Sequence, residues 1–177
     1  MKLTKRIAIG NEAIEQTLTA LVRAVDEMIC PIGFNQTDRN EWERKGAWKI
    51  EEIDLGVKEG LHYRVLPSFR ILLPRTRVSE LGDEYQYIAQ DNVCKVLRPD
   101  KNAEYVKVPR VSLGAGRFVR SIVTDIKSAL PWFDQFATPE LCKANLGKFL
   151  KPGCPAYVDA EEFLSTLVRA ASSTHDA

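Results

Sequence analysis

The sequence predicts an α+β fold: an antiparallel β-meander covered on one face by an N-terminal helix and by C-terminal helices. Residues 11–30 carry apolar side chains at three- and four-residue steps, as in a helix with one buried face. Residues 34–112 contain short stretches in which polar and apolar residues alternate, as in half-buried strands. Helical periodicity returns after residue 115. Helices and strands are therefore segregated along the chain, which is typical of α+β proteins.

The first predicted helix runs from Asn11, a suitable N-cap, to Cys30. Pro31 and Gly33 follow it directly and should end it and turn the chain. At the other end of the chain, residues 172–177 lack periodicity and are expected to form a flexible tail. We therefore expect a single domain over residues 1–171.

The strand-rich region contains several alternating segments separated by turn residues. Residues 34–44 are polar and predict an exposed edge strand, whereas the alternation that starts at Trp48 breaks at Glu51 and Glu52. Pro67 suggests an edge or a bulge, because proline cannot donate to a β-ladder. The remaining predicted strands cover residues 61–65, 69–73, 85–89, 93–97 and 104–112.

Three helices are predicted after the strands. The first covers residues 115–130 and is ended or kinked by Pro131. The second opens with Thr138 as a hydroxyl cap and Pro139 in the first position. The third is expected to begin at Asp159, which with Glu162 resembles a capping box. Trp132, next to the proline break, is expected in the core.

Composition excludes several classes of protein. The chain has 177 residues, 45% of them hydrophobic, so it can bury a core without metals or disulfides. Its 25 basic and 24 acidic residues give a net charge of +1, which argues against a dedicated nucleic-acid binder but leaves room for a local basic patch. No apolar run is long enough for a membrane helix or a signal peptide, so a cytoplasmic protein without membrane association is expected.

Cysteine and histidine usage gives no metal or cofactor site. The four cysteines are scattered without a Cys-x-x-Cys pair, and only two histidines are present. A structural zinc ion requires about four well-spaced ligands, so neither zinc nor any other cofactor is expected. A disulfide framework is not expected in a cytoplasmic chain of this size. The cysteines are Cys30, Cys94, Cys142 and Cys154, and the histidines are His62 and His175.

No catalytic set is predicted either. His62 could act as a general base, but it alternates with apolar residues and should face solvent without a partner. Asp100, Glu104 and Lys107 are a poor match to a metal-dependent nuclease core, because residues three apart on a strand point to opposite faces. A solvated turn explains them better.

Gly114 and Gly116 lie where a predicted strand leads into a helix. Free backbone N–H groups at such a turn can hold an anion, and Arg117 and Arg120 follow closely. The dinucleotide fingerprint requires a further glycine, but Val119 occupies that position. A structural turn is therefore favoured, with anion binding as the alternative.

The predicted contact surface lies on the sheet edge. Trp42 stands within a charged strand, which favours an interface anchor over a core residue. An acidic stretch follows nearby and reads as a solvated strand edge. The predicted partner-binding residues are Trp42, Arg44, Glu51, Glu52 and Asp54.

The layout resembles a bacterial family of small domains of unknown function, of the kind encountered beside immunity proteins of polymorphic toxin systems. The resemblance rests on the helix ending at Gly33-Phe34, a Trp/Arg-rich strand pair, the strand at residues 69–73, and the helix ending at residues 130–133. It covers about two thirds of the chain, and residues 75–103 have no counterpart in it. It implies a binding role without a catalytic set.

We therefore expect a non-enzymatic cytoplasmic protein that binds and occludes a partner protein, with a toxin as one candidate. Such a surface gains affinity from a few buried anchors and complementary charge. One alternative is an enzyme or enzyme subunit that uses the Gly114–Gly116 turn to hold phosphate or a nucleotide. Another is a structural component that self-assembles.

Overall fold

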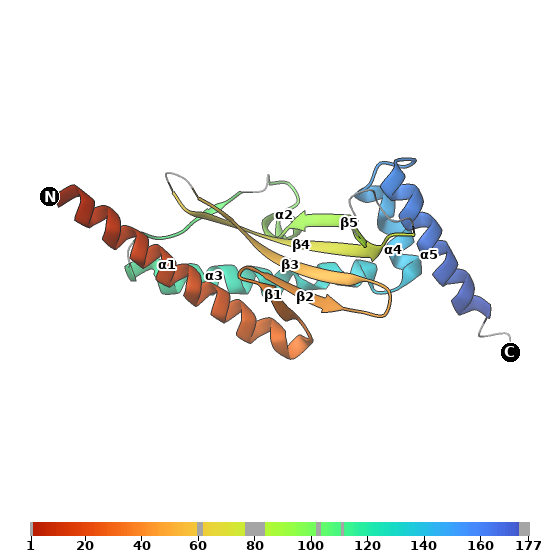
Figure 1. The fold of residues 1–177 in the computed structure, drawn as a ribbon, viewed down its shortest axis with the longest axis horizontal. Coiled ribbons are helices and arrows are strands. Elements are labelled where there is room, and N and C mark those ends of the chain that lie inside the picture. Colours follow the sequence, from red (N-terminus) through yellow and green to blue (C-terminus); the bar gives the residue numbers. More distant parts are fainter. Residues whose placement is uncertain (1, 60–61, 77–83, 102–103, 111, 174–177) are drawn as a thin grey trace. The chain divides into compact units, whose positions relative to one another are not determined.

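The computed structural model describes residues 2–59, 62–76, 84–101, 104–110 and 112–173, and it confirms the α+β fold class. Five strands form an antiparallel meander in the order β1-β2-β3-β4-β5, and β6 pairs with β4 (Figure 1). The strands are β1 (Asn35–Asp38), β2 (Glu41–Lys45), β3 (Ile50–Lys58), β4 (Arg64–Pro74), β5 (Tyr85–Asn92) and β6 (Val106–Lys107).

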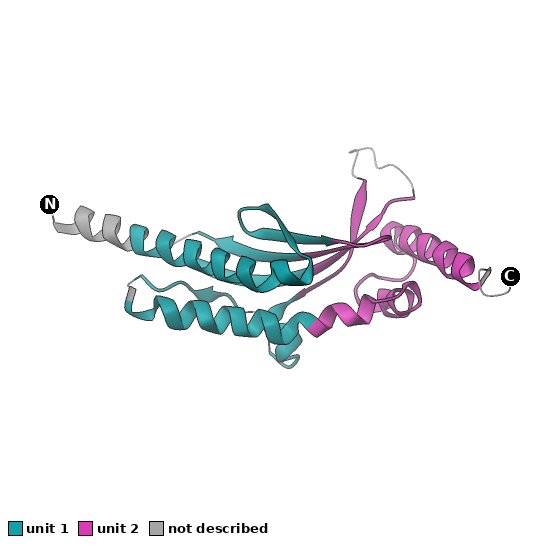
Figure 2. Ribbon diagram, turned by 90° about the horizontal axis from the view of Figure 1, so that it is seen from below, with its two compact units in different colours: residues 1–44, 53–69, 92–130 teal, residues 45–52, 70–91, 131–177 magenta. Residues whose placement is uncertain are grey.

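The chain divides into two compact units, coloured separately in Figure 2. Unit 1 comprises residues 1–44, 53–69 and 92–130, and unit 2 comprises residues 45–52, 70–91 and 131–177. Both β3 and β4 contribute residues to each unit. The single domain expected over residues 1–171 stays a prediction.

In unit 1, helix α1 (Lys2–Ile29) packs beside α3 (Ser112–Ala129), as Figure 2 shows. The helix begins nine residues earlier than predicted, so Asn11 lies inside it and is not its cap. Its buried residues recur at the predicted three- and four-residue steps: Ile14, Leu18, Leu21, Val25 and Ile29. A short 3-10 helix, η1 (Cys30–Ile32), follows, and Gly33 ends it with a φ of 92°, where glycine is favoured.

The polar segment after Gly33 forms a hairpin of two strands, β1 and β2, where one edge strand was predicted. Trp42 in β2 has no exposed surface, and its indole N–H donates to the Asp26 carboxylate of α1 at 3.0 Å. Arg39 in the hairpin turn also pairs with Glu15 of α1 at 2.7 Å. These two contacts attach the hairpin to the helix, so the prediction that Trp42 is an exposed anchor is wrong.

Strand pairing is more continuous than the sequence suggests. β3 runs through the predicted break at Glu51 and Glu52, and β4 runs through Pro67. Pro67 does not lie on an edge strand, because β4 is flanked by β3 and β5. The predicted strand at residues 93–97 is instead the short helix α2 (Val93–Leu97), and the predicted strand at residues 104–112 is reduced to β6.

The sequence signals correctly locate the end of α3 and the start of α4. α3 gives way at Leu130 to a 3-10 helix, η2 (Leu130–Phe136), which contains the buried Trp132 as predicted. α4 (Pro139–Asn145) is capped by the Thr138 hydroxyl, which accepts the Leu141 N–H at 3.3 Å.

A further 3-10 helix, η3 (Leu146–Lys148), follows α4 and leads to the last helix, α5 (Pro155–Ser173). Because α5 starts before Asp159, this residue is not its cap. The expected tail overlaps the end of α5, and residues 174–177 lie outside the described residues. None of the described helices is long and apolar enough to cross a bilayer.

Candidate functional site

Strand β5 in unit 2 presents aromatic residues on its outward face. Tyr85 and Tyr87 are 41% and 52% exposed. Gln86, which lies between them, and Ile88, which follows Tyr87, are buried. The strand predicted at residues 85–89 is confirmed, and Ala89 at its end is also buried. β5 is also the last strand in the sheet order, so it has a neighbouring strand on one side among the described residues.

Arg70 of β4 fixes the position of Tyr87. Its guanidinium carbon lies 5.4 Å from the centre of the Tyr87 ring, within the range of a cation–π interaction. The same guanidinium pairs with Glu52 of β3. The side chains of Arg70 and Glu52 are 18% and 5% exposed, so this ion pair lies beneath the tyrosine and holds it at the surface.

On its other face, β5 is attached to α5 by a polar cluster. The buried Gln86 donates from Nε2 to the Asp159 carboxylate at 2.8 Å. The backbone N–H and the hydroxyl of Thr76 also donate to Asp159. Within the described part of the chain, the buried Gln86 Oε1 atom has no hydrogen-bond partner, and Asp159 supplies the hydrogen bond that this amide makes.

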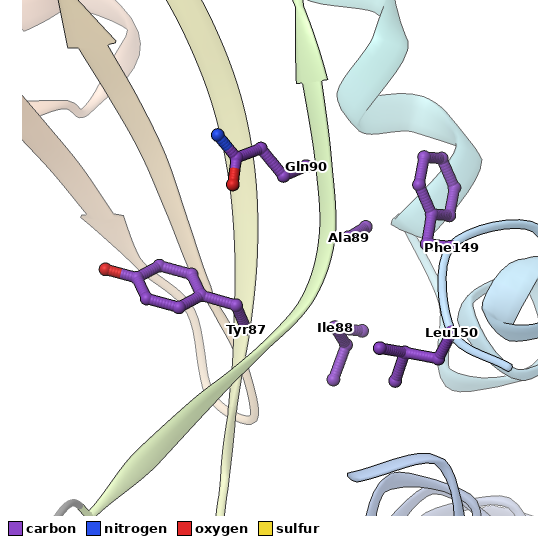
Figure 3. A pocket seen from close by; sticks show the side chains of 6 residues that line it. All are labelled: Tyr87, Ile88, Ala89, Gln90, Phe149 and Leu150. Atoms are coloured by element: carbon purple, nitrogen blue, oxygen red, sulfur yellow. The ribbon is translucent and has the colours of Figure 1, made fainter. Parts of the chain in front are cut away.

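A pocket of about 160 Å³ lies between β5 and the segment after η3 (Figure 3). Ile88 and Ala89 face Phe149 and Leu150 across it, while the side chain of Tyr87 points away from it (Figure 3). The Phe149 ring is 5.6 Å from Phe136 and 6.0 Å from Trp132, so a cluster of aromatic rings supports this wall. The lining is mostly apolar and suits an apolar side chain.

A buried ion pair also stabilises unit 2. The Lys49 ammonium lies 2.6 Å from a Glu51 carboxylate oxygen, with side chains 10% and 7% exposed. It also donates to the Phe136 carbonyl oxygen at 2.5 Å. This contact joins the start of β3 to the 3-10 helix that carries the aromatic cluster.

Cys142 and His62 are two described side chains whose pKa values are shifted. Burial raises the pKa of the Cys142 thiol to about 12, although Lys49 opposes the shift, so this thiol is protonated at neutral pH. The pKa of His62 is lowered, first by desolvation and then by neighbouring cations. Within the described ranges, no group of three His, Cys, Asp or Glu side chains is placed to hold a metal ion.

The predicted partner-binding residues do not form an exposed edge. Glu51, Glu52 and Asp54 are 5%, 4% and 9% exposed, because β3 is a central strand with neighbours on both sides. Asp54 accepts from the Ser68 hydroxyl at 3.5 Å, and the two glutamates pair with cations as described above. The prediction of a solvated acidic edge is wrong.

Arg44 is also held within unit 1. Its guanidinium carbon lies 4.7 Å from the centre of the Phe34 ring, and the group donates to the Ile32 carbonyl oxygen at 3.1 Å. Its side chain is half-buried and braces the turn between α1 and β1.

The predicted anion-binding turn is absent as well. α3 begins at Ser112, so Gly114 and Gly116 lie inside the helix. A side chain at Gly114 would contact Pro109 at 3.4 Å, which explains a small residue there by packing. Arg117 and Arg120 are exposed on α3. The Arg120 guanidinium lies 3.6 Å from the place that a Cβ atom would occupy if residue 116 had a side chain.

Sequence reasoning missed the surface of β5. A signal was present, since Tyr85 and Tyr87 alternate with Gln86, and tyrosine is enriched in interfaces. The partners that define the surface, Arg70 and Phe149, are distant in sequence and have no local signal.

Comparisons with protein-family models, with curated proteins and with solved structures found no match to this chain.

Proposed function

We propose that this chain is a binding protein that recognises another protein through the outer surface of β5. The observation that carries the proposal is the pair of exposed tyrosines, Tyr85 and Tyr87, on the last strand of the sheet. Tyrosine and arginine dominate the energetics of many interfaces, because they combine apolar area with polar groups. Arg70 already orders Tyr87 in the free chain, which lowers the entropy lost on binding.

The apolar pocket beside β5 gives this surface a second feature. An apolar side chain of a partner would fill it between Ile88 and Phe149, while the tyrosines contact the rim. Affinity would then come from burial and shape, with no bond made or broken.

An immunity-type role, in which the occluded partner is a toxin, is the specific form of this proposal. We also place the protein in the cytoplasm. All four cysteines are unpaired, which fits a reducing compartment.

The test is affinity capture with the tagged full chain, followed by titration calorimetry with the purified partner. The Tyr85→Ala/Tyr87→Ala variant should lose the partner by at least about tenfold in affinity. A matched control is Leu141→Ala/Val158→Ala, which removes two residues of unit 2 that are 45% and 47% exposed. If both variants retain the partner, or if wild type captures none, the proposed surface is wrong.

The immunity-type form needs its own assay. Co-expression with a captured toxin should restore growth, and the tyrosine variant should fail to protect. Growth protection that persists in the tyrosine variant would contradict it.

The competing functions have different readouts. Phosphate or a nucleotide bound to the native chain would raise its melting temperature, because a ligand stabilises the state that it binds. A self-assembling component would show a mass that rises with protein concentration.

A further inference from the structure

Unit 1 contains a cross-strand pair of like charges. In the antiparallel pairing of β4 with β6, Arg64 lies opposite Lys107 and Val65 lies opposite Val106. Side chains directly opposite each other project from the same face, with Cβ atoms about 5 Å apart. Two cations in this arrangement repel each other and destabilise the pair. Both side chains are exposed.

Further residues project from the same face of this ladder. Side chains alternate along an extended chain, so Tyr105, directly before β6, is expected on the face of Lys107. The Lys58 ammonium, at the end of β3, lies 5.9 Å from the centre of the Tyr105 ring. The face therefore contains three cations and one tyrosine that is 41% exposed.

The titration of His62 supports this placement. Desolvation is the largest cause that lowers the pKa of His62. The positive charges of Arg110, Lys107 and Arg64 lower it further, in that order. Since all of these charges are positive, His62 lies in a basic environment.

Among the described residues, no ion pair compensates the positive charge of this face. Lys58, Arg64 and Lys107 form no salt bridge with any residue that the structure describes. The chain as a whole is almost neutral, with a net charge of +1, so the charge on this face is local. A local patch of this kind is compatible with polyanion binding, even though the overall composition argues against a dedicated nucleic-acid binder.

We propose that this face, made of Lys58, Arg64, Lys107 and Tyr105, binds single-stranded nucleic acid. Adjacent strands are about 4.8 Å apart, so cations on three neighbouring strands span roughly 10 Å. That width exceeds one phosphate group and suits successive phosphates of a chain. The Tyr105 ring, near the Lys58 ammonium and 41% exposed, provides a surface on which an unpaired base can stack.

The aromatic ring distinguishes this ligand from other polyanions. In a duplex the base faces are already stacked on each other, so Tyr105 would gain nothing from them. An acidic peptide would neutralise the cations but has no base to stack. The inference is independent of the proposed function, because it concerns unit 1 whereas β5 belongs to unit 2.

The experiment is fluorescence anisotropy of the full chain with labelled oligothymidylate and oligouridylate of about twelve nucleotides. The Arg64→Gln/Lys107→Gln variant should bind about tenfold or more weakly. The slope of log affinity against log salt, measured between about 50 and 200 mM, should fall in magnitude by about 1.4 for the two lost phosphate contacts. The affinity for the oligonucleotides should fall about tenfold or more in Tyr105→Ala, whereas Tyr105→Phe should retain binding.

The matched control is Lys127→Gln/Lys151→Gln, which removes the same charge from two exposed lysines elsewhere. It should change affinity by less than about threefold, because binding at this face depends on the charges of the face itself. Nonspecific attraction depends mainly on net charge, so it would weaken equally in both variants. The melting temperature of each variant checks that it is folded. The proposal is overturned if wild type fails to bind, if the control loses as much as the test variant, or if duplex or polyglutamate binds equally well.

Discussion

The acidic residues of β3 and the basic residues of the β4–β6 face are both sets of like charges, but they differ in burial and in their partners. Glu51 and Glu52 are buried, and each meets a cation that is also largely buried. Arg64 and Lys107 are exposed, and they face each other. Burying a charge requires a partner, whereas water can solvate an unpaired one. The first set therefore contributes to the fold, and the second is available to a ligand.

The largest effect should come from breaking a buried pair in β3. Lys49→Met leaves the Glu51 carboxylate buried without its ammonium partner, and it also removes the donor to the Phe136 carbonyl. We expect the free energy of unfolding to fall by about 3–5 kcal/mol in urea titrations.

The double variant Lys49→Met/Glu51→Leu sharpens this test. Removing both charges should recover much of the lost stability, because no unpaired charge remains. Arg23→Met is the control, since its pair with Glu27 is 81% and 63% exposed and should matter little. A Lys49→Met variant as stable as wild type would show that this pair is not buried in solution.

The same comparison shows what sequence can predict. The amphipathic face of α1, the end of α3 and the cap at Thr138 were predicted because their signals lie within a few residues of each other. The burial of Glu52 was not, because its partner Arg70 lies 18 residues away on another strand. An acidic run therefore looks solvated until the strand order supplies its cations.

Trp42 gives a similar lesson. Its neighbours in sequence are charged, which favoured an exposed anchor, but Asp26 of α1 accepts its indole N–H from 16 residues away. The candidate surface on β5 also depends on distant contacts, because Phe149 and Leu150 complete its pocket. Local patterns thus located most elements and the buried face of α1, but not the burial of Trp42, Glu51 and Glu52 in the sheet.

A moderate loss of stability is expected from a substitution at Asp159, whose carboxylate accepts hydrogen bonds from neutral donors. Asp159→Ala removes the contacts to Gln86 and Thr76 and leaves the buried Gln86 amide without a partner. The free energy of unfolding should fall by about 1–3 kcal/mol. Adding Gln86→Leu should reduce that loss, because no buried polar group is then unsatisfied; a strictly additive double variant would argue against the coupling.

A smaller effect is expected at the start of α4, where the carboxylate is exposed. The pKa of Glu140 is lowered, first by a hydrogen bond from its own backbone N–H and then by the Thr138 hydroxyl. A lowered folded pKa contributes stability above the unfolded value, and this contribution is lost as pH falls through the folded pKa. Thr138→Ala should cost about 1 kcal/mol at neutral pH. Its cost should shrink below about pH 4, and a pH-independent cost would show that Glu140 is not involved.

The smallest effect should be a gain in stability on the basic face. Arg64→Gln/Lys107→Gln removes a repulsion between directly opposed cations, so the free energy of unfolding should rise by about 0.2–1 kcal/mol at low salt. The gain should vanish near 1 M salt, where the screening length falls to about 3 Å. A loss of stability instead would mean that these side chains make contacts needed by the fold. Together with weaker oligonucleotide binding, a gain would show that this face retains its like charges for a ligand, at the expense of stability.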